Sequence, residues 1–187
     1  MTTLIDFYNN FETLWEKTEE ELDKALPKII HELEQNAKPI ANTSFENVKS
    51  LWGVYVFFII PNKKFNEKKL IKDWENSNEG HIKFPKVCKS RFEKSIHSKT
   101  THYTFYIGKS EQVGKRIKEH ITHNKHASTY GLKLKDRHFT NTHKITYAYW
   151  QLPNTLQENN NKPIKQFIIT QLERKLRNRL NPWIGKQ

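Results

Sequence analysis

The sequence predicts an α+β fold in which a small antiparallel or mixed sheet of about three strands is flanked by helices, with a helical arm at the N-terminus. Three runs rich in β-branched and aromatic residues, at 51–60, 102–107 and 145–152, have the composition of buried strands. Two longer stretches, 3–36 and 163–180, instead repeat apolar residues at intervals of three and four, the period of an amphipathic helix. A chain of 187 residues can bury such a core without disulfides.

The N-terminal arm carries an apolar stripe that is expected to pack on the rest of the chain. Its members recur at helical spacing and include Leu4, Phe7, Phe11, Leu14, Trp15, Leu22, Leu26, Ile29, Ile30 and Leu33. Pro27 lies within this stretch, and proline removes a helical hydrogen bond. We therefore expect two helices, one ending near Ala25 and the second starting at Pro27. Residues 36–42 have the composition of a linker.

Charge divides the chain into two parts with opposite signs. Residues 1–50 hold 5 Lys and Arg against 10 Asp and Glu, a net charge of −5. Residues 51–187 hold 27 against 10, a net charge of +17. We interpret the first part as an acidic helical arm and the second as a basic domain. A strongly basic domain indicates a polyanionic partner, because lysine and arginine release counterions when they meet phosphates.

Cysteine content and hydropathy exclude several classes of protein. Cys88 is the single cysteine, so an internal disulfide is excluded and a reduced, cytoplasmic setting is expected. No run approaches the roughly 20 apolar residues that a membrane-spanning helix needs. The sequence therefore predicts a protein that works in the cytoplasm and has no membrane partner.

Two short motifs lie in the first two predicted strands. The first is G-V-Y, ending at Tyr55, and the second is Y-I-G-K, from Tyr106 to Lys109. If the two strands are neighbours in the sheet, the two tyrosines lie side by side. Arg116 and His120 follow in a predicted helix over 111–123, and their spacing of four places them on one face of that helix.

A single carboxylate stands out in the last predicted helix. Glu173 lies at the border of the apolar stripe formed by residues such as Leu172 and Leu176. A carboxylate at this position either pairs with Arg177, four residues on, or is held over a cleft.

Together these motifs resemble the GIY-YIG nuclease superfamily, whose members cut nucleic-acid backbones with one divalent metal ion. The helical arginine of the family falls on Arg116, and His120 occupies a slot where relatives carry histidine or tyrosine. The family's metal-binding glutamate opens a segment E-x-x-L-I-x-x-x-x-P-x-x-N, which here reads E-R-K-L-R-N-R-L-N-P-W-I-G from Glu173. Gly185 stands in place of the final asparagine, and that role would fall to Asn181 or to Gln187.

The spacing between the motifs departs from compact members of the family. Fifty residues separate Tyr55 from Tyr106, where compact members place about ten. Restriction-type members carry insertions at this point, so we interpret 61–101 as an insertion within a nuclease domain spanning 51–187.

The resemblance implies a catalytic set and a metal ion. The set comprises Tyr55, Tyr106, Lys109, Arg116, His120 and Glu173. Glu173 would bind Mg²⁺ or Mn²⁺, which prefer hard oxygen ligands, and the guanidinium fork of Arg116 suits phosphate oxygens. Either Tyr55 or His120 would act as the general base. For Tyr55 we expect Lys109 or the metal-bound water network to lower the pKa of its phenol.

The expected function is that of a metal-dependent endonuclease that hydrolyses DNA, most consistent with a site-specific, restriction-type enzyme, and a homodimer if its site is palindromic. Double-stranded DNA is the expected partner. The alternative is a non-catalytic or structure-specific nucleic-acid-binding protein of the same fold, with RNA also open as the ligand. Basic residues around Phe84 and Phe92 suit a nucleic-acid strand, or else form a solvated helix with two core phenylalanines. The residues expected to bind nucleic acid are Lys83, Lys86, Lys89, Arg91, Lys94 and Lys115.

Overall fold

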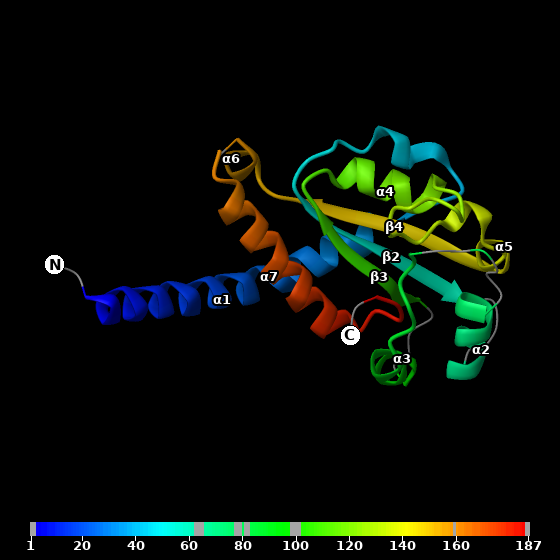
Figure 1. The fold of residues 1–187 in the computed structure, drawn as a ribbon, viewed down its shortest axis with the longest axis horizontal. Coiled ribbons are helices and arrows are strands. Elements are labelled where there is room, and N and C mark those ends of the chain that lie inside the picture. The colour runs from blue at the N-terminus through cyan, green and yellow to red at the C-terminus, as the bar shows by residue number, and fades with distance from the viewer. Residues whose placement is uncertain are drawn as a thin grey trace.

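Four strands form one antiparallel sheet at the centre of the molecule (Figure 1). The structure, a computed structural model, describes residues 3–61, 66–76, 80, 83–97, 102–158 and 160–185. The strands, in the spatial order β1-β4-β2-β3, are β1 (Lys38–Pro39), β2 (Gly53–Pro61), β3 (Tyr103–Ser110) and β4 (His143–Gln151). The predicted fold class is confirmed, and the three long strands are those that the composition predicts.

Helices cover both faces of this sheet. The long helices α1 (Leu4–Gln35) and α7 (Lys162–Leu180) lie on one face, and α4 (Val113–Thr122) lies on the other (Figure 1). The shorter helical segments are η1 (Thr43–Asn47), α2 (Glu67–Ile71), the π-helical η2 (Lys72–Asn76), α3 (Lys89–Ile96), η3 (Leu134–Asp136), α5 (Phe139–Thr142) and α6 (Asn154–Gln157).

Strand β2 lies inside the sheet and feeds two separate hydrophobic cores. Successive side chains of a strand point to opposite faces, and both faces are covered here. The side chains of Tyr55, Phe57 and Ile59 pack with α4. The side chains of Val54, Val56 and Phe58 pack with α1 and α7.

A β-bulge in β3 sets which face the second motif presents. Phe57 pairs with Tyr106, but the next residue, Phe58, pairs with Thr104, so Phe105 is an extra residue in β3. As a result the consecutive residues Phe105 and Tyr106 both pack in the core on the α4 side of the sheet. Tyr106 therefore points to the same side as Tyr55.

The expectation of two helices in the N-terminal arm is wrong, because α1 runs without a break through Pro27. Proline removes one hydrogen bond to the preceding turn, but tertiary packing keeps the helix continuous. Ile29 and Leu33, beyond the proline, are buried against Leu172 and Leu176 of α7. The C-terminal half of α1 thus packs on the domain as expected, while its N-terminal half projects away from the body (Figure 1).

The predicted linker and insertion contain more regular structure than their composition indicates. Within 36–42, the two residues of β1 pair with β4, and Pro39 is tolerated there because β1 is an edge strand. Within the insertion 61–101, α2, η2 and α3 are formed, while residues 62–65, 77–79, 81–82 and 98–101 lie outside the described part of the chain.

Candidate active site

The two signature strands bring their tyrosines together. Tyr55 lies opposite Gly108, and the ring centroids of Tyr55 and Tyr106 are 6.2 Å apart. A Cβ atom on Gly108 would lie 2.3 Å from the hydroxyl oxygen of Tyr55, so the ring occupies the space that a side chain would need. The glycine of the second motif is therefore what allows the tyrosine of the first to lie across β3.

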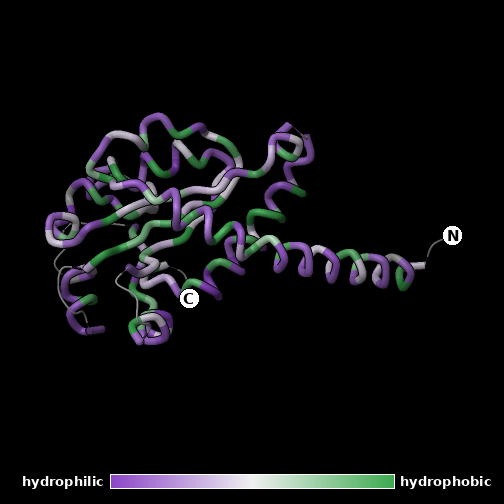
Figure 2. Tube along the Cα trace, turned by 180° about the vertical axis from the view of Figure 1, so that it is seen from behind, coloured by the Kyte–Doolittle hydropathy of each residue, from purple (hydrophilic) through white to green (hydrophobic). Residues whose placement is uncertain are grey.

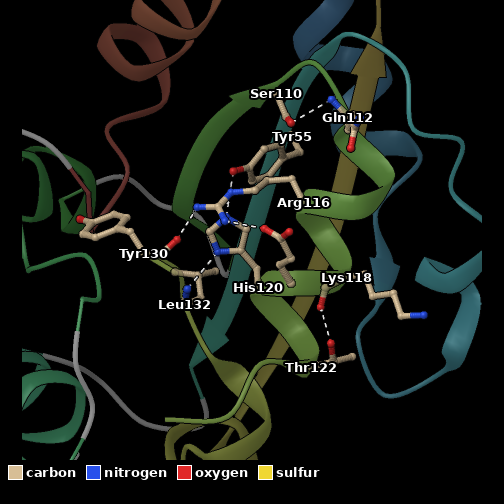
Figure 3. Close-up of polar contacts among 10 residues, drawn as sticks. Tyr55, Ser110, Gln112, Arg116, Lys118, His120, Thr122, Tyr130 and Leu132 are labelled. Carbon is tan, nitrogen blue, oxygen red and sulfur yellow. Dashed lines mark hydrogen bonds and ion pairs between the residues drawn. The ribbon is translucent and has the colours of Figure 1, made fainter. Parts of the chain in front are cut away.

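A buried histidine holds the hydroxyl group of Tyr55. Its oxygen lies 2.8 Å from Nε2 of His120, and the backbone N–H of Leu132 donates to Nδ1 of the same ring at 2.9 Å (Figure 3). Because Nδ1 accepts, the neutral imidazole carries its proton on Nε2 and donates it to Tyr55. Burial and the charge of Arg116 hold the pKa of His120 well below its usual value, so the ring is neutral at pH 7.

Arg116 lies one helical turn before His120 and places a guanidinium group beside Tyr55 (Figure 3). Its Nη1 donates to Oε2 of Glu119 at 2.7 Å, and its Nη2 donates to the backbone carbonyl of Tyr130. The side chain is about one-fifth exposed. Both Nη atoms of this guanidinium are thus held by hydrogen bonds, and the side chain is still accessible to solvent.

Glu173 is both ion-paired and held at a cleft, so the two alternatives for this carboxylate are realised together. Its Oε1 lies 2.9 Å from Nη2 of Arg177, and its Oε2 lies 3.5 Å from Nζ of Lys109. Arg177 also donates to the carbonyl of Ile107 at 3.2 Å, which ties α7 to the edge strand β3. The carboxylate is thereby positioned at the edge of the sheet.

One cavity of about 210 Å³ joins these groups. Its wall contains Tyr55, Tyr106, Gly108, Lys109, Arg116, Tyr130, Glu173 and Arg177. Five of the six predicted catalytic residues therefore face a common space. The sixth, His120, is fully buried behind Tyr55 and contributes through its hydrogen bond.

Burial controls the acidity of both tyrosines. It raises the pKa of Tyr55 well above the usual value, and the pKa of Tyr106 rises to about 12 for the same reason. Arg116 opposes this shift at Tyr55 through its charge and a hydrogen bond, but the effect of burial is larger. Among the residues that this structure describes, no cation brings the pKa of Tyr55 below its ordinary value, and Lys109 pairs with Glu173.

The loop that supports His120 and Arg116 depends on a buried arginine that the sequence patterns do not reveal. Nε of Arg137 donates to the carbonyl of Leu132 at 2.6 Å, and Nη1 donates to the carbonyl of Trp74 at 2.9 Å. The guanidinium carbon lies 3.6 Å from the centroid of the Trp74 ring, and burial lowers the pKa of Arg137 to about 9. Residues of the insertion thereby help to place the backbone amide that orients His120.

Three further residues of the site, Tyr130, Leu132 and Arg177, were missed as functional candidates. Arg177 is detectable in the sequence as the residue four positions after Glu173, on the same side of the helix. Tyr130 and Leu132 contact Arg116 and His120 through backbone atoms. Backbone contacts leave no trace in residue identity, so no sequence signal points to them.

The basic residues predicted to bind nucleic acid lie outside the catalytic cavity. Lys89, Arg91 and Lys94 line a separate cavity of about 500 Å³ between α3 and the end of α7. Lys89 also pairs with Glu67 at 2.9 Å. Asn181, a candidate for the role of the family asparagine, lines this same cavity and not the catalytic one; the other candidate, Gln187, is outside the described residues.

The remaining predicted contacts are spread over the surface near the insertion and α4. Lys83 and Lys115 are exposed, and Nζ of Lys86 lies 4.4 Å from the centroid of the Phe84 ring. Phe92 is buried in the core, so it is not available to stack on a base. Here the alternative of a core phenylalanine is the correct one.

The donor set fits a divalent cation that is bound mainly through water and substrate. Glu173 is the one carboxylate on the cavity wall as described, and no group of three or more His, Cys, Asp or Glu side chains gathers elsewhere in that part of the chain. Mg²⁺ accepts such sites, because it keeps several waters and takes one or two carboxylates together with phosphate oxygens. Both oxygens of Glu173 are held by cations in this structure, so the ion would compete with Lys109 and Arg177.

Comparison with known proteins finds no match: no protein family, no curated protein and no solved structure is detectably similar to this chain. Any assignment therefore rests on the residues and geometry given above. Across the residues that the structure describes, no helix is long and apolar enough to cross a membrane.

Proposed function

We propose that this protein is an endonuclease that hydrolyses phosphodiester bonds of DNA with Mg²⁺ or Mn²⁺, as the GIY-YIG nucleases that its motifs resemble do. The observation that carries the proposal is the single cavity in which Tyr55, Tyr106, Arg116 and Glu173 meet. These side chains come from β2, β3, α4 and α7, so the fold brings together residues that are far apart in the sequence. The net charge of +17 over residues 51–187 supplies attraction for a polyanion.

The cations on the cavity wall suit the scissile phosphate. Arg116 and Arg177 each present a planar, permanently charged fork that matches phosphate oxygens. Lys109 adds a third positive charge on the same wall. Together they would bind the phosphate and stabilise the negative charge that develops on it during attack.

Tyr55 is the group proposed to face the attacking water. Its oxygen accepts a hydrogen bond from Nε2 of His120, and a hydrogen bond to the charged form favours the phenolate. The phenolate takes a proton from water while the water oxygen bonds to phosphorus and the bond to the departing oxygen breaks. His120 is a positioning residue in this scheme, because both of its ring nitrogens are already engaged.

Glu173 is the residue proposed to hold the metal ion. When bound, a divalent cation neutralises charge on the phosphate and polarises it toward attack. Lys109 and Arg177, which pair with Glu173 in this structure, would then be free to turn to the phosphate oxygens.

A plasmid-nicking assay tests the proposal. Wild-type protein should nick supercoiled DNA in Mg²⁺ or Mn²⁺ but not in EDTA. Glu173→Gln, which keeps the shape of the side chain, should lose at least a hundredfold in rate and still bind DNA. Glu20→Gln is the matched control, because Glu20 is an exposed glutamate of α1 far in sequence from the cavity wall, and it should cut like the wild type.

The second candidate is a protein of this fold that binds nucleic acid without cutting it. The engagement of both Glu173 oxygens by cations favours this candidate, as does Gly185 in the place of the family asparagine. It predicts that wild-type protein binds DNA or RNA in a gel-shift assay but never nicks either under Mg²⁺ or Mn²⁺. That result would contradict the proposed hydrolysis.

Site specificity is the finer part of the proposal. The insertion and the cavity between α3 and α7 place additional basic side chains outside the catalytic cavity, as an enzyme that reads its own target would require. Sequencing the ends cut from a mixed-sequence DNA library should yield one recurrent motif. Scattered ends, or cuts confined to branched structures or to RNA, would contradict a restriction-type role.

A further inference from the structure

Among the residues that the structure describes, most of the exposed large apolar side chains lie on one half of one helix. Leu4, Ile5, Tyr8, Phe11 and Leu14 are between 53% and 84% exposed. All five belong to the N-terminal part of α1, which extends away from the rest of the molecule (Figure 2). In the described part of the chain, Tyr130 and Ile164 are the other large apolar side chains with comparable exposure.

The exposed residues continue a stripe that is already used for packing. Leu4, Tyr8, Phe11 and Trp15 follow one another at intervals of four, three and four, so they share one face of the helix. The ring of Trp15 lies 5.3 Å from that of Phe167 in α7. Beyond Trp15 the same face meets α7 and the sheet through Leu26, Ile29 and Leu33.

Ion pairs fix the attached half of α1 but do not reach the projecting half. Glu19 lies 2.8 Å from Nη2 of Arg174 and 3.0 Å from Nζ of Lys175, and Asp23 lies 2.7 Å from the same lysine. The helix is therefore anchored from about Trp15 onward. Before that point the large apolar side chains that the structure describes are more than half exposed.

The projecting part of α1 continues the anchored helix and is capped by the Thr3–Asp6 capping box. Packing on its own domain adds little to its stability, because its large apolar side chains are more than half exposed. An aromatic side chain can bury roughly 150–250 Å², and leucine or isoleucine less, so the five exposed side chains of α1 and Ile164 together present on the order of 700 Å². Ile5 and Leu14 lie on the two flanks of the stripe. The total is therefore an upper bound on what one partner covers, and it is close to the roughly 800 Å² per partner of a standard protein interface.

We propose that this stripe pairs with the same stripe of a second copy of the chain, as an antiparallel helix pair around a two-fold axis. A second copy supplies an apolar face of equal length and shape, as an isologous interface requires. In this arrangement the tip of each arm would lie toward the start of the partner's α7, where the exposed Ile164 would also be covered.

The position of α7 determines the antiparallel direction. In α1 the face that projects and the face that packs on α7 are one continuous stripe. A parallel partner would bring its own α7 into the space of the first α1. An antiparallel partner instead covers the stripe from Leu4 to Trp15, and its globular part lies past the N-terminal end of the first helix. The proposal is independent of the nuclease activity, because it uses none of the residues of the catalytic cavity.

Sedimentation equilibrium of the full chain tests the pairing. The wild type should be a dimer at micromolar concentration, and Phe11→Glu should raise the dimer dissociation constant at least a hundredfold. Thr13→Glu adds the same charge two residues on, on the opposite face of the helix, where Thr13 is exposed, and it should change the constant less than threefold. A monomeric wild type, a larger assembly, or equal effects of the two variants would overturn the proposal. Circular dichroism of the variants confirms that each retains the fold.

Disulfide trapping tests the direction of the pair. The background carries Cys88→Ser, which removes the single native cysteine. Phe11→Cys lies near the centre of the pair and should form a covalent dimer on mild oxidation. Leu4→Cys should not, because at a rise of about 1.5 Å per residue its two copies lie roughly 16 Å apart along the antiparallel axis. Efficient trapping through Leu4→Cys would show a parallel pair and contradict the geometry proposed here.

Discussion

Replacing Gly108 by alanine tests the packing on which the candidate site depends. The added Cβ atom would lie 2.3 Å from the hydroxyl oxygen of Tyr55, 2.4 Å from its Cζ and 2.9 Å from its Cε2. The ring cannot turn aside freely, since it is 1% exposed and bonded to His120. Overpacking a buried site costs about 1–3 kcal/mol, and displacing the hydroxyl adds about 1 kcal/mol for the lost hydrogen bond. We expect Gly108→Ala to lower the free energy of unfolding by about 2–4 kcal/mol.

Urea denaturation followed by circular dichroism measures this loss, and the chain offers a matched control. At Gly131 the same substitution would place a Cβ atom 3.6 Å from Nδ1 of His120, an ordinary contact. Gly131→Ala should therefore be neutral, or stabilising by about 0.4–1 kcal/mol through the unfolded state. Equal destabilisation by the two variants, or a loss below about 0.5 kcal/mol at Gly108, would refute the argument that the glycine exists to admit the ring.

Four further predictions concern the same region. Tyr55→Phe should abolish DNA cleavage and, by leaving the Nε2 proton of His120 unsatisfied, destabilise the fold by about 1–3 kcal/mol, as measured by nicking and by urea titration. The cleavage rate should rise about tenfold per pH unit from pH 7 to 9, because the pKa of Tyr55 lies well above its usual value and the phenolate is the active form; a flat profile would exclude Tyr55 as the base. The free energy of unfolding should fall as the pH drops below about 6.5, because His120 then takes up a proton in the unfolded chain but not in the folded one. His120→Gln should remove most of this pH dependence of the unfolding free energy. Arg137→Met should lower the free energy of unfolding by about 2–4 kcal/mol, as measured by urea titration. The variant loses the hydrogen bonds to the carbonyls of Leu132 and Trp74 and the stacking of the guanidinium on the Trp74 ring.

The parts of the fold that the sequence predicts are those in which a periodic pattern and packing agree. The long strands are visible because their side chains are buried on both faces, and the convergence of Tyr55 with Tyr106 follows once their strands are neighbours. Glu173 is also predictable, because its position at the border of an apolar stripe places it beside the body of the protein. Fixed spacing within single elements thus accounts for most of the cavity wall.

The parts that could not be predicted depend on contacts between distant elements. Pro27 has the local signal of a helix break, but the burial of Ile29 and Leu33 on α7 overrides that signal. Arg137 lies in a basic, loop-like stretch of the sequence that predicts a solvent-exposed cation. In the structure it is only 1% exposed and stacks on Trp74 of the insertion. Leu132 acts through its backbone amide. In each case the deciding interaction lies outside the local window from which a pattern is read.

The bulge at Phe105 makes the tolerance of β3 to deletions unequal along its length. Removing Phe105 would leave a regular ladder, in which Tyr106 still faces Phe57 and Gly108 still faces Tyr55. Removing Ile107 would instead shift the parity of the strand, so that a tyrosine or a glycine would be turned to the opposite face. The bulge at Phe105 can therefore take up a one-residue change in the length of the chain before it, without altering which face of the sheet the residues from Tyr106 to Lys109 present.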